Sequence, residues 1–313
     1  MKERLVSVVT GGTGFVGSHL ADLLIAKGHK VKVIARNTSS MKWLEGKDIE
    51  VADCGLFDKE KLIQVVKDAD YVFHVAGVVK AKEWEDYLKG NVETTKNVLD
   101  AVSEGNPNIK KVVVVSSFTA AGPSTKEKAV NEDSPLNPIT RYGKSKKAQE
   151  ELVHKYMDKL PITICRPPAV FGERDTEIYL VFRTYLQGLM TMVGFDEKKV
   201  SLIHVTDLVN GLYLAAISEN SEGQTYFISS DEFYTWPRVA DAIKKATGKG
   251  ALRLRLPHFL VYTVAVFAEF FSMFSSKAAT FNIEKARDFV QPFWTCDISK
   301  AKRELGFRQE ISL

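Results

Sequence analysis

The sequence lacks most of the patterns that mark metal-binding, disulfide-rich or nucleic-acid-binding proteins. Its 313 residues include three cysteines, Cys54, Cys165 and Cys296, in neither a disulfide framework nor a metal-ligand spacing. Lys and Arg number 43 and Asp and Glu 39, and the net charge of +4 is spread along the chain without a basic stripe. The six histidines form no HxxxH-like pair. We therefore expect a cytoplasmic protein with no bound metal and no nucleic-acid partner.

Long apolar runs are also missing, and the N-terminus has no signal-peptide cleavage site. The most apolar window, FLVYTVAVFAEFF, covers residues 259–271 and extends raggedly to Phe274. It is too short for a typical membrane span and contains Glu269. We expect a buried amphipathic helix here. A peripheral membrane contact or a dimer contact through residues 259–274 are the alternatives.

Short β-branched runs alternate with helical patterns over the first two-thirds of the chain. The expected strands lie at residues 5–10, 30–35, 70–76, 110–117 and 161–167, and the expected helices at 19–27, 61–69, 91–104 and from Tyr142. This alternation predicts an α/β fold, a doubly wound parallel sheet of the Rossmann type. We expect a dinucleotide-binding domain over 1–167 plus about 205–230, and a smaller substrate-binding lobe over 168–204 plus about 231–313.

The first expected strand runs directly into a glycine-rich loop and then a helix. Gly11, Gly14 and Gly17 follow the spacing GxxGxxG. Gly11 allows the sharp turn, Gly14 lets backbone N–H groups approach a pyrophosphate, and Gly17 lets the helix pack closely on the sheet. This arrangement predicts that the protein binds a dinucleotide.

The end of the second strand bears on which dinucleotide is bound. NAD sites usually have an acid there for the ribose 2′-OH, whereas this chain has Ala35 followed by Arg36. A guanidinium can hold a 2′-phosphate through two hydrogen bonds, so the sequence favours NADP. If Arg36 is only a solvated surface residue, NAD is the alternative. Asp53, after the next strand, is a candidate for the adenine amino group.

Three side chains form the candidate catalytic set. Tyr142 and Lys146 are four residues apart at the start of a helix, so they can project into one cleft. A phenol titrates near pH ~10, and a nearby ammonium or an oxidised nicotinamide would lower its pKa toward neutrality. Ser117 follows the strand KKVVVV at the edge where open α/β sheets bind ligands. It can hold a substrate carbonyl beside the phenol, or it can be a turn or cap serine.

These residues resemble the extended short-chain dehydrogenase/reductase superfamily, which includes NAD-dependent epimerases/dehydratases and dihydroflavonol- or 3β-hydroxysteroid-type reductases. The resemblance covers nearly the whole chain and rests on the order and spacing of eight segments. They are TGGTGFVG (10–17), FHVAG (73–77), NVETTKNVL (91–99), VSSFTAAG (115–122), NPITRYGKSK (137–146), RPPAVFG (166–172), HVTDLVNG (204–211) and DISKAKRELGF (297–307).

The resemblance implies roles for individual residues. Tyr142 would be the catalytic acid–base, Lys146 would lower its pKa and reach the nicotinamide ribose, and Ser117 would orient the substrate. Asn91 would have a structural or water-relay role. Further cofactor contacts are implied for Thr13, Phe15, Val16, Ala76, Gly77, Pro168 and Val170. The resemblance also implies a homodimer, with residues 91–104 as one contact face.

The resemblance leaves more than one function open. The leading interpretation is an NAD(P)-dependent oxidoreductase that transfers hydride at a hydroxyl or carbonyl carbon of an alicyclic or steroid-like small molecule. The alternative is a nucleotide-sugar epimerase/dehydratase with tightly bound NAD. Arg174, as a partner for a phosphate, favours that alternative, whereas Ala121 stands where sugar epimerases commonly have tyrosine. A non-catalytic dinucleotide-binding regulator is a second alternative, which the intact set of Ser117, Tyr142 and Lys146 disfavours.

Overall fold

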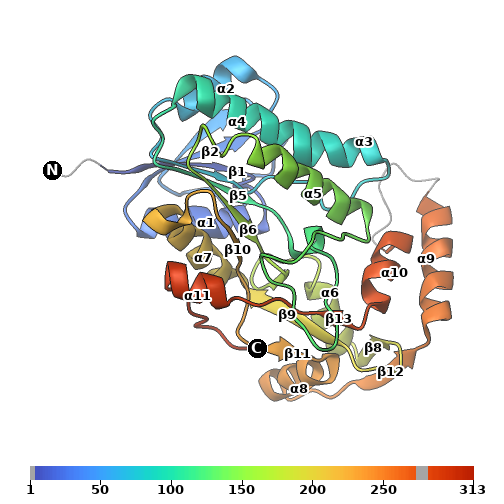
Figure 1. Ribbon diagram of the computed structural model, residues 1–313. Coiled ribbons are helices and arrows are strands. Elements are labelled where there is room, and N and C mark those ends of the chain that lie inside the picture. Colours follow the sequence, from blue (N-terminus) through green and yellow to red (C-terminus); the bar gives the residue numbers. More distant parts are fainter. Residues whose placement is uncertain (1–3, 273–280) are drawn as a thin grey trace.

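The computed structural model describes residues 4–272 and 281–313. A seven-stranded sheet lies at its centre, in the order β10-β6-β5-β4-β1-β2-β3, with every neighbouring pair parallel. The strands are β1 (Val6–Thr10), β2 (Lys30–Ala35), β3 (Ile49–Asp53), β4 (Tyr71–His74), β5 (Lys111–Val115), β6 (Ile162–Arg166) and β10 (Thr225–Phe227). Helices cover both faces of the sheet (Figure 1). The predicted doubly wound α/β fold is confirmed.

Two apolar layers hold the helices to the sheet. One layer joins the sheet to α1 (Phe15–Ala26) and α7 (Val205–Ile217) through side chains such as Leu20 and Leu208. The other layer holds the helices α2 (Lys59–Val66), α4 (Thr94–Gly105) and α5 (Arg141–His154). Short helical turns precede α4 and follow β5: α3 (Trp84–Tyr87), the π-helical η1 (Leu88–Glu93) and the 3-10 helix η2 (Phe118–Ala120). Strands β4 to β6 are buried on both faces, which explains their unbroken apolar runs.

A second group of elements occupies the lower right part of Figure 1. Strand β9 pairs with β7, β11 and β13, and β8 pairs with β12. These strands are β7 (Ala169–Phe171), β8 (Leu189–Val193), β9 (Lys199–His204), β11 (Phe233–Tyr234), β12 (Leu252–Leu256) and β13 (Phe293–Trp294). The accompanying helices are α6 (Tyr179–Leu186), α8 (Trp236–Thr247), α9 (His258–Ser272) and α10 (Ile283–Val290).

The chain then returns to the main sheet. The short helix η3 (Glu219–Ser221) precedes β10, and α11 (Ser299–Leu305) is the last helix of the chain. Ala301 and Phe307 belong to the same apolar layer as α7. The expected boundaries between a dinucleotide-binding domain and a substrate-binding lobe stay a prediction.

Helix α9 has a narrower buried face than we expected, made of side chains that pack against α10. Only Val261 and Ala265 are buried, whereas Phe259, Phe267 and Phe271 are 72%, 59% and 66% exposed. The helix is apolar on both sides, so its sequence does not show which side meets the protein. The expected extension to residue 274 lies outside the described residues.

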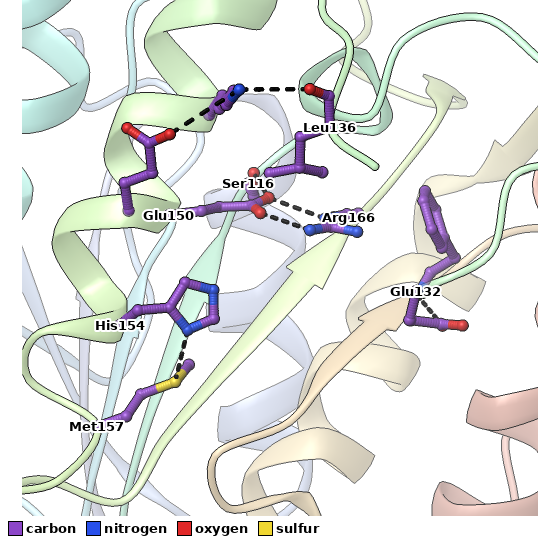
Figure 2. Close-up of polar contacts among 10 residues, drawn as sticks. Ser116, Glu132, Leu136, Glu150, His154, Met157 and Arg166 are labelled. Atoms are coloured by element: carbon purple, nitrogen blue, oxygen red, sulfur yellow. Dashed lines mark hydrogen bonds and ion pairs between the residues drawn. The ribbon is translucent and has the colours of Figure 1, made fainter. Parts of the chain in front are cut away.

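A buried ion pair ties the helix α5 to the carboxyl ends of β5 and β6. The Arg166 guanidinium donates to both carboxylate oxygens of Glu150, at 2.9 and 2.6 Å, and the Ser116 hydroxyl donates to the same carboxylate at 2.5 Å (Figure 2). Both charged side chains are at most 5% exposed. A charge buried this deeply is tolerated because its partner is held in ideal geometry, so losing one partner is costly.

Breaking this pair should destabilise the protein far more than breaking a surface pair. We expect Glu150→Gln to lower the free energy of unfolding by about 3–5 kcal/mol, because Arg166 stays buried without its counter-charge. The matched control is Asp48→Asn, which breaks the exposed Arg4–Asp48 pair and should cost less than about 1 kcal/mol. Urea unfolding measures both variants. Equal, small losses would contradict this account of the α5 anchor.

Candidate active site

The glycine loop between β1 and α1 has the shape that a pyrophosphate needs. Gly11 has φ +70°, and a Cβ there would lie 2.8 Å from the backbone N of Ala76. A Cβ on Gly17 would lie 2.2 Å from the carbonyl oxygen of Gly11, so only glycine lets α1 approach the loop. Gly14 is the exposed N-cap of α1, and no side chain caps the helix there. The first N–H groups of α1, next to Phe15 and Val16, are therefore available to phosphate oxygens.

The other expected cofactor residues lie on the same edge of the sheet. Arg36 follows β2, Asp53 ends β3, and both are exposed. Ala76 follows β4, and its N–H donates to the Thr10 hydroxyl at 3.1 Å, which holds this segment against the start of the loop. Gly77 is also exposed beside it. The residues present thus fit a dinucleotide that lies across the carboxyl ends of β1, β2 and β4.

The catalytic candidates come from two neighbouring elements. The Thr140 side chain caps α5 by accepting from the N–H of Gly143 at 3.2 Å, which places Tyr142 in the first turn of that helix. Ser117 follows β5 and caps the short helix η2 by accepting from the N–H of Thr119. Its cap role and its proximity to the phenol are compatible, since Ser117 also lies near enough to the Tyr142 phenol to lower its pKa. The structure thus brings Ser117 and Tyr142 together.

Burial decides the protonation state of Tyr142. It raises the pKa of the phenol to about 12, even though the nearby Ser117 hydroxyl acts in the opposite direction. The negative charges that Tyr87 and Asp288 can carry raise this pKa further. At neutral pH the protein by itself therefore holds Tyr142 as a neutral phenol, which is a proton donor.

Lys146 is almost completely buried one turn farther along α5. Its ammonium donates to the carbonyl oxygen of Val115 at 2.9 Å and to Oε1 of Gln149 at 2.7 Å. Burial lowers the pKa of Lys146 to about 8, whereas the carboxylate of Glu150 raises it. A Cβ on Gly77 would lie 3.5 Å from the Lys146 nitrogen, so the amine stands beside an expected cofactor residue. Its predicted effect on the pKa of Tyr142 stays a prediction.

A buried hydrogen-bond chain connects Lys146 to the strand that carries the glycine loop. Gln149 donates to the Thr95 hydroxyl at 2.8 Å, and Thr95 donates its own hydrogen to the carbonyl oxygen of Asn91. Nε2 of His74 must therefore donate to Thr95, at 2.8 Å, and Nδ1 accepts from Thr10, also at 2.8 Å. Burial lowers the pKa of His74 to about 3, which keeps this imidazole neutral. Sequence reasoning missed His74, Thr95 and Gln149, which carry no recognisable spacing.

The side chain of Asn91 holds two segments of the site together. Its Oδ1 accepts from the N–H of Val78 at 2.7 Å, and its Nδ2 donates to the carbonyl oxygen of Val78 and to the Ser145 hydroxyl. Ser145 in turn donates to the carbonyl oxygen of Tyr142 at 2.7 Å. Asn91 thus holds the segment after β4 against the first turn of α5.

The remaining expected residues lie at the border of the two parts of the chain. Pro168 and Val170 are half-buried, and Val170 belongs to β7, which pairs with β9. We expected Arg174 to bind a phosphate, but its guanidinium has partners within the protein. Its guanidinium binds the Ser18 hydroxyl at 3.0 Å and the Asp22 carboxylate at 2.8 Å, so it ties the segment after β7 to α1.

Comparison with known proteins decides the family. The model of the NAD-dependent epimerase/dehydratase family matches residues 7–236. The chain belongs to the NAD-dependent epimerase/dehydratase family. The resemblance to the extended short-chain dehydrogenase/reductase superfamily is confirmed, and this family member is an enzyme that uses a nicotinamide dinucleotide.

Relatives of this family member act on different substrates. It is 26% identical to a ceramide reductase of Caulobacter vibrioides, over 93% of this chain and 86% of the relative. It is also 26% identical to sterol demethylase protein B of Methylococcus capsulatus, over 96% and 93% of the two chains. The structure of a UDP-glucuronic acid 4-epimerase from Bacillus cereus with NAD has a TM-score of 0.79 at 22% identity, and the match covers 98% of this chain and 94% of that one. That last likeness shows the fold alone.

Proposed function

We propose that this enzyme reduces a carbonyl group of a hydrophobic, uncharged substrate, with NADPH as the favoured cofactor. The observation that carries the proposal is the half-buried phenol of Tyr142, which its surroundings keep neutral beside the Ser117 hydroxyl. A neutral phenol is the form that donates a proton to the oxygen of a carbonyl group as it becomes an alkoxide. The names of the ceramide and sterol relatives support a lipid-like substrate.

Each residue has a distinct part in this proposal. The bound nicotinamide supplies hydride to the carbonyl carbon. Ser117 holds the carbonyl oxygen in place, and Tyr142 donates a proton to that oxygen. Lys146 lies near the expected nicotinamide ribose, where its amine can bind the ribose hydroxyls and compensate the charge of a tyrosinate. Asn91 and the chain through Gln149 keep these groups in position.

A nucleotide-sugar epimerase/dehydratase is the alternative function. Its chemistry uses the same Ser117, Tyr142 and Lys146, and it differs in keeping NAD bound through the cycle. Arg174 no longer supports it, because the guanidinium is occupied by Ser18 and Asp22. The homodimer stays a prediction from the resemblance.

Tyr142→Phe tests the proposed reaction. We expect it to lower the rate of NADPH-dependent reduction of alicyclic and long-chain ketones by about 10²–10⁴-fold, because the proton donor is gone. Nucleotide binding should be unchanged. Tyr185→Phe is the matched control, since Tyr185 is buried away from the site and donates to the carbonyl oxygen of Lys249. Equal rates for Tyr142→Phe and the parent protein would remove Tyr142 from the mechanism.

The preference for NADPH rests on Arg36. We expect the parent protein to bind NADPH about 10–100-fold more tightly than NADH, as for a hydrogen-bonded ionic contact with the 2′-phosphate. Arg36→Ala should abolish this ratio, and Lys30→Ala, at the opposite end of β2, should keep it. Dissociation constants from nucleotide fluorescence measure both. A purified protein that releases stoichiometric NAD on denaturation would instead support the epimerase/dehydratase.

The outward face of α9 suits a lipid surface, and we propose that it makes a peripheral membrane contact. Most of its exposed residues are uncharged, and Glu269 near the C-terminal end is an exposed acid among them. The uncharged ones include Phe259, Leu260, Thr263, Val264, Val266, Phe267, Phe270 and Phe271. Arg253 and Arg255 are exposed on β12, just before the helix. Arg253 pairs with Asp241, so Arg255 supplies the positive charge beside the apolar face, which suits anionic headgroups. Figure 1 shows α9 at the edge of the molecule, with α10 between it and the main body. None of the helices in residues 4–272 and 281–313 is long and apolar enough to cross a membrane.

Vesicle sedimentation tests the proposed contact. We expect the protein to bind vesicles of phosphatidylcholine and phosphatidylglycerol, and the triple replacement of Phe259, Phe267 and Phe271 by serine to abolish binding, because three aromatic anchors are lost. Phe57→Ser is the control, as Phe57 is 51% exposed in the segment between β3 and α2. Vesicle binding that survives the triple replacement would contradict the proposal. A parent protein that is dimeric and does not bind vesicles, together with a triple variant that is monomeric, would also contradict it. The apolar face of α9 would then be a dimer contact.

A further inference from the structure

Helix α10 is docked against the first turn of α5. The Glu284 carboxylate accepts from the backbone N–H of Arg141, which directly precedes Tyr142. Lys285 binds the Glu177 carboxylate at 2.5 Å, and Lys80 binds the same carboxylate from the segment after β4. Asp288 lies one turn after Glu284, on the same face of α10. This face therefore meets the corner of the site that holds Tyr142.

The Asp288 carboxyl group has an unsatisfied oxygen. Its Oδ1 is buried and has no hydrogen-bond partner among the residues that the structure describes. The main-chain oxygen of Asp288 accepts from Nε1 of Trp294 at 2.9 Å, which fixes the residue without satisfying its side chain. A buried polar atom without a partner costs about 1–3 kcal/mol, so it calls for an explanation. A ligand that reaches this oxygen would supply one.

Helix stability offers no reason for an acid at this position. Asp288 lies in the last turn of α10, which ends at Val290. Negative charge at the C-terminal end of a helix opposes the helix dipole. The residue is thus unfavourable both for its burial and for its place in the helix.

Asp288 shares its surroundings with the reacting phenol. Its charge raises the pKa of Tyr142 and of Tyr87, whose rings lie 6.4 Å apart. Burial, and then the charge of Glu284, raise the pKa of Asp288 itself to about 7, and Lys285 acts in the opposite direction. An anionic substrate group beside this carboxyl would add a second buried negative charge. A neutral hydrogen-bond donor would satisfy the free oxygen.

We propose that Asp288 is a substrate-binding residue whose carboxyl group accepts a hydrogen bond from a hydroxyl or amide N–H group next to the reacting carbonyl. The substrate is then a neutral molecule with a hydrogen-bond donor beside the carbon that is reduced. A carboxylate or phosphate at that position is disfavoured, because it would meet the charged form of Asp288 or require that carboxyl group to take up a proton. This inference rests on the proposed function, since it takes Tyr142 as the proton donor to the same carbonyl.

Two small probes that differ by one hydroxyl group test the proposal. Cyclohexanone and 2-hydroxycyclohexanone are titrated into the protein with saturating oxidised nucleotide, so that no reduction takes place, and binding is followed by ligand-observed NMR. We expect the parent to bind the hydroxyketone about threefold to tenfold more tightly, as one added hydrogen bond predicts. Asp288→Leu should reduce this ratio to about one. Asp288→Asn, which keeps an acceptor oxygen and the side-chain shape, should retain a preference.

The controls separate this inference from the proposed function. Asp241→Leu replaces an exposed acid on α8 and should keep the ratio of the parent. Tyr142→Phe should also keep it, while losing turnover. If Asp288→Leu keeps the affinity ratio of the parent, the role of Asp288 is overturned and the proposed function still stands. The same conclusion follows if the parent binds the two probes equally or binds neither. Undiminished turnover by Tyr142→Phe overturns the function instead.

Discussion

The buried pair of Glu150 and Arg166 is the contact on which the geometry of the site depends. It fastens α5 to the ends of the two strands beside it, and the Ser116 hydroxyl joins the same carboxylate. Tyr142, Lys146 and Glu150 are spaced four residues apart, so one face of α5 carries the proton donor, the amine and the anchor. The anchor thus sets where the phenol stands relative to the edge of the sheet.

Burial is the common cause of the electrostatics in this site. It pushes each group toward its neutral form, with a pKa of about 12 for Tyr142, about 8 for Lys146, about 7 for Asp288 and about 3 for His74. Charges introduced into such a low-dielectric region act strongly. The positive charge of an oxidised nicotinamide, or a polar substrate group, would therefore change the protonation of these residues more than it would in water.

The sequence predicts the fold and the core of the site because both depend on local patterns. Alternating apolar strands and helices, the glycine spacing, and the spacing of Tyr142 and Lys146 are all short-range signals. His74 and Asp288 reach the site from elements far apart in the chain, and no periodicity marks them. The α9 prediction was wrong for a physical reason: a helix that is apolar all round has no polar side to identify its outer face.

The titration of Tyr142 tests the central claim most directly. Carbon-13 NMR of ζ-labelled tyrosine, with Tyr142→Phe to assign the signal, follows the phenol without and with saturating oxidised nucleotide. We predict that Tyr142 without nucleotide stays protonated above the ordinary pKa of 10.0, and that the nicotinamide charge lowers its pKa. If Tyr142 ionises together with the exposed tyrosines, or if the nucleotide leaves its pKa unchanged, burial does not govern this site.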